Sequence, residues 1–362
     1  MNQFAPPFFI EKRPFVVAGP CSAESREQVM ETCQSLADSG KIDALRCGIW
    51  KPRTRPDTFE GIGEEGLSWM QEAKEATGLP LATEVANTHH IERAMKAGID
   101  ILWIGARTTV NPFSVQEIAD ALKGSDVTVL VKNPIHADVE LWTGAVERFQ
   151  NAGLNNLGLI HRGFAQHRQN AYRNEPKWQL AVEMKRRFPR LPLICDPSHI
   201  AGERKLIQEI AQQALDLDFD GLMIESHIDP DRALSDKKQQ LVPADLVSLL
   251  NELVVREAAI SDEELILKME LLRKQIDVID EELVKLLGDR MKVAEEIGLI
   301  KREKGITILQ RERWEEIIAQ VQANGQVQGL SKKFLTSYLN AIHQESIEHQ
   351  SEVMNQADLQ NK

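Results

Sequence analysis

One pattern repeats eight times along the first two-thirds of the chain: a short apolar, β-branched run with polar residues at its end, then a helical stretch. The runs are FVVAGPCS (15–22), DALRCGIW (43–50), LPLATEV (79–85), DILWIGAR (100–107), TVLVKNP (128–134), LGLIHRGF (157–164), LPLICDPS (191–198) and GLMIESH (221–227). Strands that are apolar on both faces suit a parallel sheet covered by helices. Eight such units predict an α/β fold of the (β/α)8 (TIM) barrel type rather than an open doubly wound sheet, which usually has fewer strands.

The last third of the chain has a different character. Residues 262–304 are heavily charged, lack proline and repeat Leu, Ile and Val at helical spacing, which predicts one long helix. Two further helices are predicted at 309–323 and 331–352, the latter capped by Ser331. A helix of about 40 residues cannot bury its apolar face against two shorter ones, so we expect this three-helix, all-α domain to form a homodimer.

These patterns divide the chain into four parts. They are a barrel (1–257), a linker (258–263), a helical domain (264–350) and a polar tail (351–362).

The composition limits the kinds of partner that the protein can bind. The formal net charge of −12 and the lack of a long basic run argue against nucleic acid binding. No segment has the apolar length of a membrane span or a secretory leader, so we expect a cytoplasmic protein without a membrane partner. The four cysteines, Cys21, Cys33, Cys47 and Cys195, show no paired spacing, which favours reduced thiols over disulfides.

Basic residues follow several of the predicted strands. They are Arg46, Lys51, Arg107, Lys132 and Arg162. The carboxyl ends of barrel strands meet at one mouth, where the chemistry of such folds is found. Each cation alone is equally compatible with a solvated rim position. Together they suit a substrate that carries carboxylate and phosphate groups, because arginine binds such groups in bidentate fashion and lysine supplies a point charge.

The same strand ends also carry a thiol, an imidazole and two carboxylates. These belong to Cys21, His199, Glu225 and Asp236. A mixed S/N/O donor set suits one divalent ion of the Mn, Fe, Co or Zn type rather than Mg or Ca. The four residues share no short motif, so spacing alone leaves another interpretation open, in which His199 caps a helix and Cys21 fills the core.

Eight short motifs, in order and one per strand end, carry a family resemblance. They are GPCSAES, KPRTRP, GAR (105–107), VKN (131–133), HRG (161–163), DPSH (196–199), IES (224–226) and SDKKQQL (235–241). Together they resemble the type I, β-subclass synthases of 3-deoxy-D-arabino-heptulosonate 7-phosphate (DAHP), over about residues 11–257. The resemblance implies a metal-dependent, aldol-like condensation of phosphoenolpyruvate with erythrose 4-phosphate, with no organic cofactor and no protein nucleophile.

The resemblance also assigns residue roles. Phosphoenolpyruvate would be held by Arg46, Lys51, Arg107, Lys132 and Arg162, the aldose phosphate by Pro52, Arg53 and Thr54, and the metal by Cys21, His199, Glu225 and Asp236. Lys51, Lys132 and His199 would act in catalysis. The related octulosonate 8-phosphate synthases have an Asn-containing loop in place of KPRT, so that activity remains the less favoured alternative.

The long predicted helix carries three cations near one face. Arg273, Arg290 and Lys301 are 17 and 11 residues apart, both close to whole numbers of helical turns. From spacing alone, a solvated stripe is the commoner explanation. Residues 264–350 nevertheless resemble the all-helical chorismate mutases, with LLRKQIDVIDEELVKLLGDRMKVAEEIGLIK matching the first helix of that family and QESIEHQ the last.

That second resemblance implies an intertwined dimer that binds chorismate and converts it to prephenate. Arg273 would reach the pocket of the partner subunit, Arg290, Arg311 and Ser346 would bind substrate, and Lys301, Gln350 and Glu312 would act in catalysis. Ile308 stands where the family usually has an acidic residue.

Two interpretations of the whole chain follow. The first is a bifunctional shikimate-pathway enzyme in which prephenate or chorismate feeds back on the synthase. The alternative is a monofunctional synthase with a non-catalytic regulatory and dimerising helical domain. Retention of Arg273, Arg290, Lys301, Glu312 and Gln350 favours the first, and Ile308 favours the second.

Overall fold

The computed structural model describes residues 14–51, 58–166, 171–256 and 262–355. The chain divides into two compact units, residues 1–258 and 259–362. The predicted positions Pro52, Arg53 and Thr54 lie outside the described residues.

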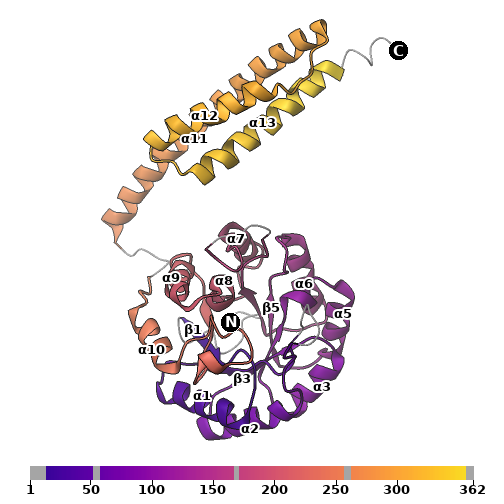
Figure 1. Ribbon diagram of the computed structural model, residues 1–362, viewed down its shortest axis with the longest axis vertical. Coiled ribbons are helices and arrows are strands. Elements are labelled where there is room, and N and C mark those ends of the chain that lie inside the picture. The colour runs from indigo at the N-terminus through magenta and orange to yellow at the C-terminus, as the bar shows by residue number, and fades with distance from the viewer. Residues whose placement is uncertain (1–13, 52–57, 167–170, 257–261, 356–362) are drawn as a thin grey trace. The chain divides into compact units, whose positions relative to one another are not determined.

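The first unit is a closed barrel of parallel strands in sequence order, as predicted (Figure 1). The strands are β1 (Phe15–Gly19), β2 (Ala44–Arg46), β3 (Leu81–Val85), β4 (Ile101–Ile104), β5 (Thr128–Lys132), β6 (Leu157–His161), β7 (Leu193–Cys195) and β8 (Gly221–Glu225). β1 pairs with β8 and closes the barrel, with Gly19 opposite Glu225. This register sets the ends of the first and last strands side by side.

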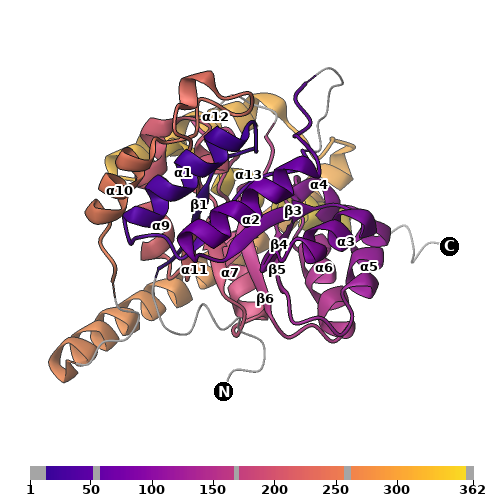
Figure 2. The same cartoon turned by 90° about the horizontal axis from the view of Figure 1, so that it is seen from below.

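Helices surround the strands (Figure 2). They are α1 (Arg26–Asp38), α2 (Glu65–Thr77), α3 (Thr88–Lys96), α4 (Ala106–Thr109), α5 (Pro112–Ala121), α6 (Val139–Asn151), α7 (Trp178–Arg187), α8 (Pro197–Ala201), α9 (Ile207–Asp216) and α10 (Pro243–Glu252). The barrel interior holds side chains such as Phe15, Trp103 and Met223. A second apolar layer, including Trp142 and Phe149, lies between strands and helices. Strand residues are therefore buried on both faces, which explains the continuous apolar runs.

Close approach of two strands next to the barrel mouth requires a glycine. Gly19 at the end of β1 has a φ of +150°, and a Cβ there would lie 2.1 Å from the carbonyl oxygen of Arg46. No other residue type fits this position without moving β1 or β2. The close contact fixes Arg46 and Cys21, two residues beyond Gly19, at the same mouth.

The second unit consists of α11 (Glu263–Lys304), α12 (Arg311–Val327) and α13 (Lys332–Asn355). The three predicted helices are confirmed, and Ser331 accepts a hydrogen bond from the Phe334 backbone N–H as a cap. Gly298 lies at a close approach of α13 to α11, since a Cβ there would approach a Val353 methyl group to 2.8 Å. Because Val353 takes part in this packing, α13 continues past Ser351, where the polar tail was expected to begin.

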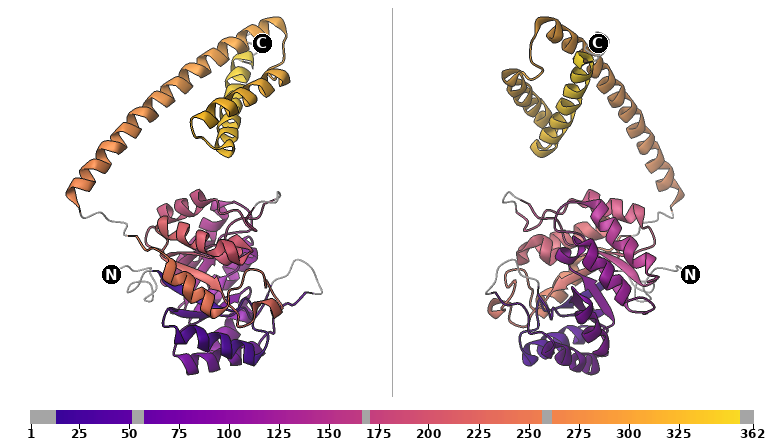
Figure 3. Two further views of the ribbon diagram at one scale, coloured as in Figure 1. Left: turned by 60° about the vertical axis from the view of Figure 1, so that its left-hand side comes forward. Right: turned by 90° about the vertical axis from the view of Figure 1, so that its right-hand side faces the viewer.

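The first half of α11 exposes a series of large apolar side chains. They are Leu265, Leu267, Leu271, Leu272, Ile276, Val278, Ile279, Leu283, Val284 and Leu286. The first buried residue of α11 is Met291. Figures 1 and 3 show α11 continuing as a single helix past α12 and α13. The homodimer stays a prediction, and these side chains are the surface it would cover.

Among the described helices, none has the length and apolar character of a membrane span.

Candidate active sites

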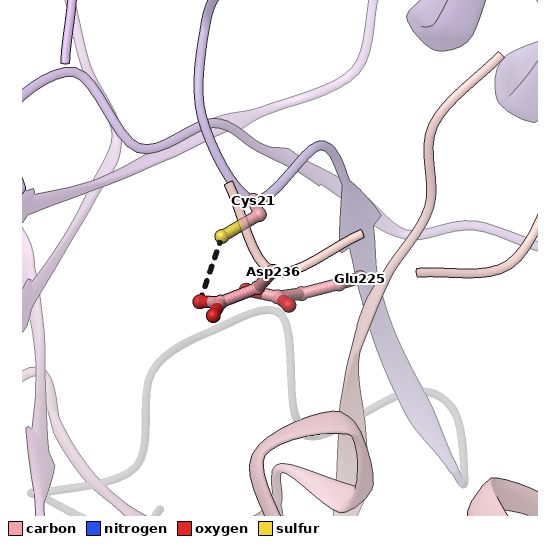
Figure 4. Close-up of side chains that lie close together, drawn as sticks. All are labelled: Cys21, Glu225 and Asp236. Carbon is pink, nitrogen blue, oxygen red and sulfur yellow. Dashed lines mark hydrogen bonds between the residues drawn. The ribbon is translucent and has the colours of Figure 1, made fainter. Parts of the chain in front are cut away.

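Three of the four predicted metal ligands meet at the barrel mouth. Cys21 follows β1, Glu225 ends β8, and Asp236 lies in the loop after β8 (Figure 4). The Cys21 Sγ and the ligand oxygens of the two carboxylates all lie within 4.8 Å of one another. Asp236 has a φ of +42°, an uncommon backbone conformation for a residue other than glycine. Strained backbone of this kind clusters at functional sites.

The fourth predicted ligand, His199, stands at the edge of this cluster on α8. Its Nε2 is 3.8 Å from Glu225 Oε1, and its Nδ1 is 2.9 Å from the Asp196 carboxylate. Burial lowers the pKa of His199, which favours the neutral imidazole needed for metal binding. The helix cap is Asp196, which accepts from the His199 backbone N–H, so the His199 side chain is left to face Glu225. This carboxylate–histidine arrangement is typical of metal sites.

A divalent cation fits the residues present. Among the described residues, Glu225 Oε1 is buried without a hydrogen-bond donor. Burial, reinforced by the charge of Glu225, raises the pKa of the Cys21 thiol to about 12. A bound metal ion would supply the partner that the Glu225 oxygen lacks. It would also lower the pKa of the Cys21 thiol, because a coordinating thiol is deprotonated.

Arg46 lies beneath the cluster and is 1% exposed. Its Nη2 is 3.3 Å from Glu225 Oε1, and its Nε and Nη1 have no hydrogen-bond acceptor among the described residues. The guanidinium lies 4.8 Å from the centre of the Trp103 ring, and Lys132 Nζ lies 5.4 Å from the same centre. Trp103 therefore supports two cations from below by cation–π attraction.

A cavity at the mouth brings together four of the five predicted cations, all except the buried Arg46. Its lining includes Lys51, Arg107, Lys132, Arg162, His199 and Asp236. Lys51 Nζ lies 3.0 Å from Cys21 Sγ, so the anion-binding cations and the ligand cluster share one space.

A buried ion pair joins the two halves of this site. Lys132 Nζ lies 2.7 Å from Asp196 Oδ2, and Asp196 is fully buried. Burial alone would raise the pKa of Asp196, but the charges of His199 and Lys132 outweigh it and hold that pKa well below its usual range. Asp196 is therefore ionised at neutral pH and orients a cation and an imidazole at once.

Other residues of the site were not singled out from the sequence. Arg173 lines the cavity, and the buried Gln239 donates to Glu225. Arg173 lies in the loop between β6 and α7, far from any strand end. Gln239 stands inside the SDKKQQL motif, but nothing in the motif distinguishes its side chain from that of a surface glutamine.

The helical unit holds a second cavity of about 280 Å³. Four of the residues predicted there line it: Arg290, Lys301, Ser346 and Gln350. Arg290 donates to the Ser346 hydroxyl, and Lys301 Nζ lies 3.2 Å from Gln350 Oε1. Lys301 also donates to the backbone carbonyl of Ile308 at 2.6 Å. Ile308 thus contributes a carbonyl oxygen where the resemblance leads one to expect an acidic side chain.

Arg273 and Glu312 do not line this cavity. Arg273 is exposed on the unpacked half of α11, Glu312 is exposed, and the Arg311 side chain is not among those described. Gln310, just before α12, lines the cavity together with Arg313, Trp314 and Ile317 of that helix. That spacing of three, four and seven residues places Glu312 elsewhere on the helix.

Two units with two distinct chemical sites define the class: a (β/α)8 barrel with a cation-lined mouth beside a cluster of candidate metal ligands, and a helical domain with a cationic pocket. The DAHP synthetase I family profile matches residues 10–260, and the chorismate mutase type II profile matches residues 272–351. Since the first match covers more than half of the chain, the chain belongs to the DAHP synthetase I family.

Individual relatives agree with this assignment. The phospho-2-dehydro-3-deoxyheptonate aldolase of Thermotoga maritima is 34% identical over 226 residues, which cover 62% of this chain and 64% of that protein. The chain thus spans less than two-thirds of that relative. A crystal structure of the T. maritima DAHP synthase superposes with a TM-score of 0.60 at 32% identity, covering 66% of this chain and 67% of that one. A 2-dehydro-3-deoxyphosphooctonate aldolase of Nitratidesulfovibrio vulgaris is 28% identical, covering 67% of this chain and 91% of its own length.

Replacing Asp196 by Asn tests the charge balance of the site. The folded-state pKa of Asp196 is depressed, so its stabilisation is fully present above its unfolded-state value of 3.8 and is lost as pH falls below that value. At pH 7 we expect Asp196→Asn to lower the free energy of unfolding by about 3 kcal/mol, because the buried Lys132 loses its counter-charge. Below about pH 4 the difference from wild type should shrink.

Denaturant titrations from pH 3 to pH 8 provide the measurement. Asp231→Asn is the control, since Asp231 is a largely exposed partner of Arg204 and its loss should be nearly neutral at every pH. Equal stability of Asp196→Asn and wild type at pH 7 would contradict this view of the buried pair.

Proposed function

We propose that this protein is bifunctional: the barrel condenses phosphoenolpyruvate with erythrose 4-phosphate to DAHP and phosphate, and the helical domain rearranges chorismate to prephenate. The observation that carries the first activity is the shared space of Lys51, the cationic mouth and the cluster of Cys21, Glu225 and Asp236. Family membership and the T. maritima relative support the same conclusion.

The cations bind and orient the anionic substrate. Phosphoenolpyruvate carries a carboxylate and a phosphate, and the buried Arg46 with its unpaired Nε and Nη1 offers donors to such groups. Lys132, held by Asp196, adds a fixed positive charge nearby. These groups are in place before substrate arrives, so little reorganisation is needed on binding.

The metal is one divalent ion of the Mn, Fe, Co or Zn type, held by Cys21, His199, Glu225 and Asp236. When bound, such an ion supplies Lewis-acid polarisation of the aldehyde oxygen of erythrose 4-phosphate. The thiol and imidazole donors favour these metals over Mg or Ca. The neutral His199, oriented by Asp196, presents its Nε2 lone pair to the cluster.

Removing the metal should separate the two activities within one chain. After treatment with a chelator, we expect loss of phosphoenolpyruvate consumption with erythrose 4-phosphate, because the aldehyde is no longer polarised. Chorismate turnover should remain, since no predicted metal ligand lies in the helical domain, and it serves as the internal control for folding. Adding Mn²⁺ back should restore the first activity.

Two results would count against this assignment. Synthase activity that survives complete removal of metal would contradict the proposed role of the cluster. Consumption of phosphoenolpyruvate with arabinose 5-phosphate but not with erythrose 4-phosphate would instead favour the octonate-forming activity named for the N. vulgaris relative.

The mutase pocket holds cationic and amide donors suited to a dianionic ether. Arg290 and Ser346 lie together for a substrate carboxylate, while Lys301 and Gln350 lie together for the ether oxygen on which negative charge develops. Burial lowers the pKa of Lys301, but its ordinary value is 10.5, so this shift is compatible with a charged amine at neutral pH.

We propose that a homodimer completes this pocket. Arg273 lies on the half of α11 that exposes its apolar side chains, away from the pocket of its own subunit. A second copy packed on that half would bury those side chains and bring Arg273 to the pocket of the partner subunit. The same contact thus accounts for both the uncovered surface and the missing cation.

Mixed dimers test this sharing of residues. Arg273→Ala and Lys301→Ala should each abolish chorismate turnover. When the two variants are unfolded and refolded together in equal amounts, half of the dimers are mixed and each holds one complete pocket of two, so about one quarter of wild-type activity should return.

A matched control uses Arg290→Ala with Lys301→Ala. Both residues act within one subunit, and every pocket in the mixed dimer then lacks one of them, so no activity should return. Failure of the Arg273 and Lys301 mixture to recover activity would contradict the partner role of Arg273. Wild-type protein without chorismate turnover would favour the non-catalytic, regulatory interpretation of the helical domain.

We further propose that prephenate bound at the helical domain lowers synthase activity. The two reactions are not consecutive in the pathway, so passing an intermediate between the sites does not explain their fusion, whereas feedback does. Prephenate should reduce the rate of phosphoenolpyruvate consumption, and Lys301→Ala should weaken this effect because it weakens prephenate binding. Lys304→Ala, an exposed change in the last turn of α11, is the control. A rate indifferent to saturating prephenate would contradict the proposal.

A further inference from the structure

In each carboxylate of the ligand cluster, one oxygen accepts a hydrogen bond from a protein side chain and the other faces the remaining ligands. Glu225 Oε2 accepts from Gln239 Nε2 at 2.7 Å, while Oε1 accepts no hydrogen bond from the described residues and lies 3.3 Å from Arg46 Nη2 and 3.8 Å from His199 Nε2. Asp236 Oδ1 accepts from Arg173 Nη1 at 2.9 Å, while Oδ2 lies 3.4 Å from Cys21 Sγ. The two held oxygens are therefore occupied by protein donors.

The two donors are themselves joined. Arg173 Nη1 also donates to Gln239 Oε1 at 2.6 Å. A continuous chain of hydrogen bonds thus runs from Asp236 through Arg173 and Gln239 to Glu225. The Gln239 amide can serve both neighbours in only one orientation, because the carboxylate requires the NH₂ group and the guanidinium requires the oxygen. Gln239 is 1% exposed, so water does not compete for these bonds.

The residues next to Arg173 and Gln239 in the sequence form hydrogen bonds with the backbone at the other two predicted ligands. The Asn174 side chain donates to the His199 carbonyl oxygen at 2.6 Å, and the Arg173 backbone N–H donates to Ala201 on the same helix, α8. The Gln240 side chain accepts from the Cys21 backbone N–H at 2.9 Å. Two dipeptides, Arg173–Asn174 and Gln239–Gln240, therefore contact all four predicted ligands or their backbone.

We propose that Arg173 and Gln239 are positioning residues that make Glu225 and Asp236 each present a single oxygen to the metal. The inference rests on the proposed metal centre. Without the bridge, either carboxylate is free to rotate and offer both oxygens or neither. Outer-shell partners of this kind typically change metal affinity by about 10- to 100-fold when removed.

Direct metal titration tests the role of Gln239 without relying on catalysis. Co²⁺ is added to the metal-free full-length protein, and binding is followed by the thiolate-to-cobalt absorption expected from Cys21. Gln239→Met keeps the length of the side chain but cannot donate to Glu225, so we expect the Kd for Co²⁺ to rise about 10- to 100-fold. Gln28→Met is the matched control, because Gln28 is a buried glutamine that hydrogen-bonds near Cys21 but not to a ligand carboxylate.

A second pair of variants keeps the test informative if Gln239→Met does not fold. Arg173→Ala removes the partly exposed end of the bridge and should raise the same Kd. Arg204→Ala removes an arginine that holds the same loop through Gln240, Lys237 and Asp231 without contacting a ligand carboxylate, and should leave the Kd unchanged.

The outcomes separate the inference from the function on which it rests. Tight Co²⁺ binding by wild type, with unchanged Kd in both Gln239→Met and Arg173→Ala, would overturn the positioning role alone. An equal rise in Kd in the control variants would also overturn it, since loosening of the loop would then be the cause. Absence of thiolate absorption in wild type would overturn the metal centre itself, and the inference with it.

Discussion

The carboxylate of Asp196 holds the barrel site together. It is fully buried, and it contacts Lys132 of the anion-binding mouth and His199 of the ligand cluster. A buried charge is tolerated only when it is paired and hydrogen-bonded, so both partners must stay in place for the fold to be stable. One carboxyl group thereby fixes Lys132, a proposed substrate-binding residue, relative to His199, a proposed metal ligand, which is a form of preorganisation.

The site nevertheless keeps groups that the protein alone does not satisfy. Within the described part of the chain, Arg46 and Glu225 retain buried polar atoms without hydrogen-bond partners. Such groups cost stability, and they are the atoms at which the proposed substrate and metal would gain binding energy. The helical unit also leaves groups without a partner. About half of α11 exposes apolar side chains, and the pocket of this unit is not lined by Arg273. Both units therefore look complete only when their proposed partners are bound.

Much of the barrel could be predicted from the sequence, because the pattern of apolar residues within each strand and helix is local. Strand periodicity gave the order of elements, and barrel topology then brought Arg46, Lys132, Cys21 and Glu225 to one mouth. The role of Arg173 could not be predicted, since its partner Asp236 is distant in sequence and Arg173 lies in a long loop, away from the end of any strand. The rotation of α12 was equally hidden, because it depends on packing against α11 and α13. Glu312 therefore fell outside the pocket that its sequence position suggested.

A crystal structure of the metal-loaded protein, with anomalous diffraction collected at the absorption edge of the bound metal, tests the central claim most directly. We expect one strong anomalous peak among Cys21 Sγ, His199 Nε2, Glu225 Oε1 and Asp236 Oδ2, beside the cations of the mouth. A peak elsewhere in the barrel, or an ordered protein with no peak at this cluster, would contradict it.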